Sequence, residues 1–181
     1  MAARALYFTG ERSVEVRREP VEDPGAGELV VETLASGISA GTELLVYRNE
    51  TPDGMTVDET ITSLDGTLDY PLRYGYAAVG EVRAAGDGVD EAWLGRRVFA
   101  FEPHASRFRV PADAVVRLPA DVDTATATLL PTLETATNFV MDARPRIGER
   151  VVVFGAGAIG LATTHVLAGF PLAALVVVEP N

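Results

Sequence analysis

The hydrophobic pattern of the C-terminal part of the chain predicts a strand, a helix and a second strand. Residues 151–154 form a continuous apolar run, which is typical of a parallel strand covered on both faces. A helical pattern follows over residues 158–167, with Gly169 and Pro171 as its stop signals. A second apolar run covers residues 172–178. This order predicts a parallel β-α-β unit.

The N-terminal two thirds of the chain show short strand patterns, separated by Gly and Pro residues that favour turns. A succession of short strands of this kind predicts a small β-barrel. The predicted strands cover residues 3–9, 13–18, 28–35, 77–84, 95–101, 107–110 and 115–118.

Helical patterns interrupt and follow these strands. A short helix is predicted over residues 43–48 and a longer one over residues 129–141. Residues 49–70 are polar and contain Gly and Pro, so a long surface loop is expected there. The change from β-rich to β-α-β character predicts two domains, residues 1–128 and 129–181.

The first strand of the β-α-β unit runs into a G-x-G-x-x-G motif made by Gly155, Gly157 and Gly160. The first glycine permits a tight turn, the second lets a pyrophosphate approach the backbone, and the third lets the helix pack closely on the strand. Ala158 and Ile159 begin the helix, whose free N–H groups attract anions. The motif predicts a dinucleotide-binding site, and a glycine turn that serves packing alone is the alternative.

Glu179 follows the second strand of this unit, at about the 20-residue spacing from the glycine motif at which dinucleotide folds place the acidic residue that binds the ribose. A carboxylate at this position would repel a 2′-phosphate. The sequence therefore predicts NAD as the cofactor in preference to NADP.

Charge and composition disfavour several kinds of partner. The net charge is −11, and all 15 basic residues are Arg, which argues against nucleic acid or an anionic membrane as the partner. The absence of Cys excludes disulfides and cysteine-ligated zinc. No apolar run reaches the roughly 18 residues of a membrane span, and the chain start shows no signal-peptide pattern, so a cytoplasmic location is expected.

Four motifs together resemble those of the medium-chain dehydrogenase/reductase superfamily. They lie at residues 37–43, 74–82 with 86–89, 94–98 and 148–151, and the last leads into the glycine motif. The resemblance covers essentially the full length of the chain. It implies a GroES-like β-barrel that carries much of a small-molecule substrate site, followed by the first β-α-β unit of an NAD(P)-binding Rossmann fold. The expected fold class is therefore α/β plus β.

The chain departs from this family at the positions of the catalytic zinc ligands, which fall on Ser39 or Ala40, on Tyr76 and on Pro131. Zn²⁺ is bound by thiolate, imidazole or carboxylate groups, and none of these side chains supplies one. The resemblance thus implies a zinc-independent oxidoreductase. It would transfer hydride between NAD(H) and an alcohol/carbonyl pair or an activated double bond.

Tyr76 and Thr42 are the candidate catalytic residues. Tyr76 replaces a ligand histidine of the family, so its phenol either donates a proton or hydrogen bond to substrate or only fills the vacated space. Thr42 matches the hydroxyl that begins the family's proton relay, or it caps a turn. Thr135 matches a threonine beside the nicotinamide, or it bonds back to its own helix. Glu43 is expected to anchor its turn, with an acid/base role as the alternative, and His104 is expected to be a solvated or capping histidine.

A dinucleotide fold contains about six parallel strands, and only the first two are predicted here. The chain is therefore expected to be truncated within the Rossmann domain, and a homo-oligomer or a complementing chain could supply the other half. A non-catalytic subunit or binding module that retains the β-barrel and half a nucleotide site is the alternative function.

Overall fold

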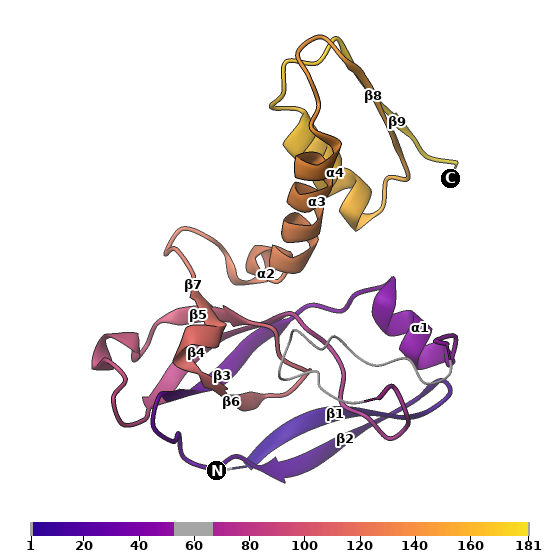
Figure 1. The fold of residues 1–181 in the computed structure, drawn as a ribbon. Coiled ribbons are helices and arrows are strands. Elements are labelled where there is room, and N and C mark those ends of the chain that lie inside the picture. The colour runs from indigo at the N-terminus through magenta and orange to yellow at the C-terminus, as the bar shows by residue number, and fades with distance from the viewer. Residues whose placement is uncertain (1, 53–66, 181) are drawn as a thin grey trace. The chain divides into compact units, whose positions relative to one another are not determined.

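The computed structural model describes residues 2–52 and 67–180, and its elements are shown in Figure 1. Contacts divide the chain into two compact units, Met1–Thr128 and Leu129–Asn181, which we call the N-terminal and C-terminal units. Much of the predicted surface loop over residues 49–70 lies outside the described residues. No helix in the described ranges is long and apolar enough to cross a membrane.

The N-terminal unit is built on a curled antiparallel sheet of five strands, in the order β6-β3-β4-β5-β7. Within the described residues this curled sheet is what corresponds to the predicted β-barrel. All five strands were predicted from sequence to within two residues at each end. They are β3 (Glu28–Ser36), β4 (Ala78–Ala85), β5 (Arg97–Ala100), β6 (Arg107–Pro111) and β7 (Val115–Arg117).

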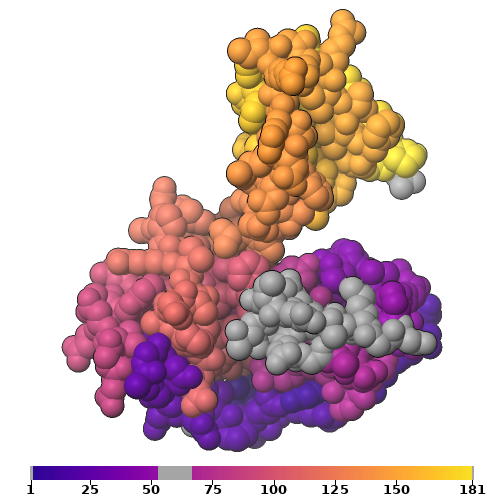
Figure 2. All heavy atoms as spheres, viewed as in Figure 1, coloured from indigo at the N-terminus to yellow at the C-terminus, as the bar shows by residue number. Residues whose placement is uncertain are grey.

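A second, two-stranded antiparallel sheet pairs β1 (Ala2–Gly10) with β2 (Ser13–Pro20). Isolated bridges join β1 to the rest of the unit, at Ala5 with Ala105 and at Phe8 with Leu72. Most residues of β2 are exposed, and the indigo atoms of the β1–β2 pair lie at the surface of the N-terminal unit (Figure 2).

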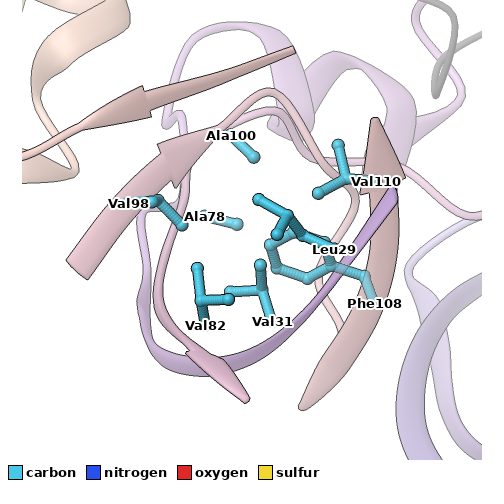
Figure 3. Close-up of a cluster of buried hydrophobic side chains, with 8 residues drawn as sticks. All are labelled: Leu29, Val31, Ala78, Val82, Val98, Ala100, Phe108 and Val110. Atoms are coloured by element: carbon cyan, nitrogen blue, oxygen red, sulfur yellow. The ribbon is translucent and has the colours of Figure 1, made fainter. Parts of the chain in front are cut away.

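The main core of the N-terminal unit lies inside the curl of the five-stranded sheet (Figure 3). Its members are small, branched or aromatic apolar side chains, which suit a pleated surface. They are Leu29, Val31, Ala78, Val82, Val98, Ala100, Phe108 and Val110. A smaller cluster of Phe8, Val46, Leu72 and Tyr74 packs the helix α1 (Thr42–Arg48) against β1 and the segment before β4.

Short helices complete the N-terminal unit. Two single-turn 3₁₀ helices, η2 (Glu91–Trp93) and η3 (Ala112–Ala114), were not predicted. The helix α2 (Thr124–Ala127) begins where the Asp123 side chain accepts hydrogen bonds from the backbone N–H groups of Ala125 and Thr126.

The C-terminal unit contains α3 (Leu130–Ala143), β8 (Arg150–Phe154), α4 (Ala158–Leu167) and β9 (Ala174–Val178). The strands β8 and β9 pair in parallel, and α4 connects them, as the predicted β-α-β unit requires. The helices α3 and α4 pack against each other, and the buried side chains of this unit are Ala136, Val140 and Leu167.

Candidate functional site

The glycine motif forms the turn between β8 and α4. Gly155 has φ +95°, a backbone conformation that favours glycine, and its N–H donates to the carbonyl of Val178 at 2.8 Å. Gly160 lies so close to this turn that an added Cβ would come within 2.0 Å of the Gly155 carbonyl oxygen. Both glycines therefore have the backbone roles that their positions in the motif predict.

Gly157 differs from its two neighbours because the space beside it is open. A Cβ on Gly157 would meet no atom within 4 Å, and the residue is exposed. Gly157 is also the N-cap of α4, and no side chain in the described part of the chain caps this helix end. Ala158 and Ile159 form the exposed first turn that follows. Uncapped N–H groups beside open space suit the oxygens of a diphosphate.

Glu179 follows β9 and reaches back to the glycine turn. Its Oε2 accepts a hydrogen bond from the N–H of Ala156 at 2.7 Å, and its side chain is exposed. An ionised carboxylate has about four acceptor positions, so this bond leaves capacity for ligand hydroxyls. The predicted ribose-binding carboxylate and the predicted phosphate-binding turn thus lie side by side.

Thr135 lies on α3 of the same unit. Its hydroxyl donates to the carbonyl of Pro131 at 2.9 Å and is partly buried. This bond is the alternative that the sequence left open for Thr135. The hydroxyl oxygen can still accept a hydrogen bond, so contact with a nicotinamide stays a prediction.

The N-terminal unit brings together Tyr76 and Thr42, which are 34 residues apart in the chain. The Tyr76 hydroxyl donates to the Thr42 Oγ1 over a long 3.4 Å, and the ring of Tyr76 packs edge to face on Tyr74. Thr42 begins α1 at the surface, and Tyr76 is half-buried in the segment that precedes β4. The two candidate catalytic hydroxyls therefore form one exposed pair.

His104 contradicts the expectation of a solvated or capping histidine. Its side chain is only 12% exposed, and its Nε2 lies 2.7 Å from the Oε2 of Glu43, whose side chain is 4% exposed. The other ring nitrogen, Nδ1, is hydrogen-bonded to the hydroxyl of Ser36. Glu43 also anchors its own turn, because its Oε1 accepts from the N–H of Ser39 at 2.8 Å. Sequence reasoning missed this pair because its members come from distant segments.

Gly75 is a sequence signal for the buried histidine, but it can be recognised only once the structure is known. This residue has φ +120°, and an added Cβ would come within 2.7 Å of the His104 Nε2. Only glycine fits over the imidazole at this point. A glycine next to Tyr76 could have suggested close packing, but not the identity of the group beneath it.

The positions at which the family places zinc ligands carry other chemistry here. The Ser39 hydroxyl accepts a hydrogen bond from the N–H of Thr42 at 3.3 Å, Tyr76 contacts the Thr42 hydroxyl, and Pro131 lies in the first turn of α3. Among the residues that the structure describes, no three His, Asp or Glu side chains are grouped to hold a metal ion.

A polar cavity of about 300 Å³ lies elsewhere in the N-terminal unit. Glu102 lines it and is 9% exposed, and burial raises the pKa of this carboxyl to about 7, although the nearby Arg73 lowers it. The Arg73 Nε is buried and has no hydrogen-bond partner in the described residues, while its Nη1 pairs with Glu19 at 3.3 Å.

Comparison with known proteins shows relatives of the expected kind, although no family model matches the chain. A 2-desacetyl-2-hydroxyethyl bacteriochlorophyllide A dehydrogenase of Cereibacter sphaeroides is 35% identical over 82 residues, which are 45% of this chain and 22% of that protein. The starvation-sensing protein RspB of Escherichia coli is 28% identical over 185 residues, covering 85% of this chain and 50% of RspB.

Solved structures share the fold. An alcohol dehydrogenase, RspB of E. coli CFT073 in complex with NADH, superposes with a TM-score of 0.81 at 21% identity over 99% of this chain and 57% of that one. A Sinorhizobium meliloti protein of the zinc-binding dehydrogenase type, bound to NADP, has a TM-score of 0.77 at 17% identity, covering 99% of this chain and 62% of its own.

The chain spans about half the length of RspB and less than two thirds of these solved chains. Over that span it shares their order of a GroES-like part followed by the start of a Rossmann fold. The resemblance that four sequence motifs indicated is confirmed, because the relatives and the solved structures of the same fold are oxidoreductases of the medium-chain dehydrogenase/reductase superfamily.

Proposed function

We propose that the chain provides the substrate-side unit and the first nucleotide-binding unit of an NAD(P)-dependent oxidoreductase that works without zinc. The observation that carries the proposal is the open, uncapped helix start at Gly157, next to the carboxylate of Glu179. The kinship with dehydrogenases and reductases supports it, and so does the NADH or NADP bound by proteins of the same fold.

The C-terminal unit would hold the adenosine diphosphate part of the cofactor. The N–H groups at the start of α4 would donate to the diphosphate, because Gly157 leaves room for phosphate oxygens to approach them. Glu179 would accept from the ribose hydroxyls and disfavour a 2′-phosphate, which favours NAD. Thr135 would contact the nicotinamide. The bound nicotinamide supplies or accepts the hydride.

Tyr76 would donate a proton to the substrate oxygen, and Thr42 would assist this transfer. A phenol has one O–H, which Tyr76 directs at Thr42 over 3.4 Å, a long and therefore weak hydrogen bond. A carbonyl substrate would take over this O–H, and the Thr42 hydroxyl would rotate to donate to the Tyr76 oxygen. That second bond stabilises the negative charge that develops on the phenol as its proton is transferred.

Zinc independence rests on the side chains at the family's ligand positions. Ser39 or Ala40, Tyr76 and Pro131 offer no thiolate, imidazole or carboxylate, which are the groups that bind Zn²⁺. Elemental analysis of the purified protein tests this part, and about one zinc per chain that survives dialysis against a chelator would contradict it.

Titration with NADH, followed by its fluorescence, tests the nucleotide site. Gly157→Val should abolish binding, because the side chain would project into the open space, where an added Cβ meets no atom within 4 Å. Gly169→Val is the matched control, since a Cβ there makes only an ordinary 3.6 Å contact with the Val166 carbonyl. Unchanged affinity in Gly157→Val would refute the site. Binding without turnover of any alcohol, carbonyl or activated alkene would favour a binding module.

A further inference from the structure

The two segments that carry Thr42 and Tyr76 both contact the imidazole of His104. Glu43 directly follows Thr42, and Gly75 directly precedes Tyr76. The Nε2 of His104 lies 2.7 Å from the Glu43 carboxylate, and the backbone of Gly75 packs so closely on the same nitrogen that a Cβ would lie 2.7 Å away. His104 therefore touches the chain immediately beside each candidate catalytic hydroxyl.

Glu43 extends this contact into the turn that presents Thr42. Its Oε1 accepts from the N–H of Ser39, and the Ser39 hydroxyl accepts from the N–H of Thr42. Glu43 is 3% exposed, and a buried carboxylate is costly unless its oxygens are hydrogen-bonded. His104 supplies the partner from outside the turn, and Ser36 fixes the orientation of the ring through Nδ1.

We propose that Glu43 and His104 are positioning residues that hold the Tyr76 hydroxyl against Thr42. They are not a proton relay, because the connection from Glu43 to Thr42 runs through the backbone N–H groups of Ser39 and Thr42. An amide donates its hydrogen bond without passing the proton on. The catalytic meaning of the pair rests on the function proposed above, whereas the contact that it holds can be measured without substrate or cofactor.

Carbon-13 NMR of the protein labelled at tyrosine Cζ tests this proposal. The chain has 5 tyrosines, and Tyr76→Phe assigns the resonance of interest. Thr42→Val removes the partner hydroxyl at nearly constant shape, and so defines the Tyr76 resonance without the contact. In His104→Ala, the Tyr76 resonance should move to its Thr42→Val position. In His104→Gln it should return toward the wild-type position, because a glutamine amide can also donate to Glu43.

Two further variants keep the test decisive. His165→Ala, in α4 of the other unit, is the control and should leave the Tyr76 resonance unchanged. If His104→Ala does not fold, Glu43→Gln preserves the side-chain volume and should displace the same resonance. A wild-type Tyr76 resonance in folded His104→Ala or Glu43→Gln would overturn the positioning role. Absence of turnover in the wild-type protein would count against the proposed function alone.

Discussion

Glu43 and His104 lie 2.7 Å apart, from Oε2 to Nε2, although 61 residues separate them in the chain. Both side chains are largely buried. The pair thus joins the first turn of α1 to the segment before β6, two segments that no strand pairing in the described residues connects. Breaking such a pair from one side leaves the other group buried without its partner.

The stability of the protein should depend on this pair. His104→Ala leaves the carboxylate of Glu43 buried with only its hydrogen bond from the N–H of Ser39, so the free energy of unfolding should fall by about 3 kcal/mol. Denaturant unfolding monitored by circular dichroism measures the change. His165→Ala, at an exposed position of α4, should cost less than about 0.5 kcal/mol. Equal effects of the two variants would contradict the assigned role of His104.

Gly160→Ala should destabilise the C-terminal unit. The new methyl group would lie 2.0 Å from the Gly155 carbonyl oxygen, so α4 must move away from the turn. The expected loss in the free energy of unfolding exceeds about 2 kcal/mol. Gly157→Ala meets nothing within 4 Å, and its expected cost is below about 1 kcal/mol. A Gly160→Ala protein as stable as Gly157→Ala would show that helix and turn are not in close contact.

Glu102 should make stability depend on pH. The carboxyl has a pKa of about 7 in the folded protein and an ordinary value of 4.5, chiefly because of burial. Well below pH 4.5 the carboxyl is protonated in both the folded and the unfolded state, so its raised pKa does not change the stability there. As the pH rises through the folded pKa, the protein loses about 3 kcal/mol relative to Glu102→Gln. Unfolding of both proteins at pH 4.5 and pH 8 measures this divergence. Parallel pH profiles would contradict it.

Glu179 should set the preference between the two nicotinamide cofactors. Glu179→Ala should weaken NADH binding by about 10- to 100-fold, because a hydrogen bond to a charged group contributes about 1.5–3 kcal/mol. Affinity for NADPH should not fall, since a negative charge near the 2′-phosphate is removed. Fluorescence titrations with both cofactors give the two dissociation constants. Glu149→Ala, at the opposite end of β8, is the control and should change neither.

Local signals explain why most elements could be predicted from the sequence. The helix expected over residues 158–167 is α4, with the same bounds, because a glycine turn begins it and Gly169 follows its end. The strands β3 and β8 likewise coincide with apolar residues that are flanked by turns. The 3₁₀ helices were missed because a single turn is too short to show a hydrophobic period.

The candidate sites were predictable where they are local in sequence. Gly155, Gly157 and Gly160 occupy a six-residue stretch, and the regular β-α-β geometry brings Glu179 back to the turn at Ala156. The partner of Glu43 could not be predicted in this way. His104 reaches it only through the pairing of distant segments, and His104 lies outside every helix and strand predicted from the sequence.

A dinucleotide diphosphate should bind the backbone amides between β8 and α4. Proton–nitrogen correlation NMR of the ¹⁵N-labelled protein, recorded during addition of NADH, tests it most directly. The largest saturable shifts should occur at the amides of Gly157, Ala158 and Ile159. Saturable shifts confined to other segments, or no shift at millimolar NADH, would contradict the claim.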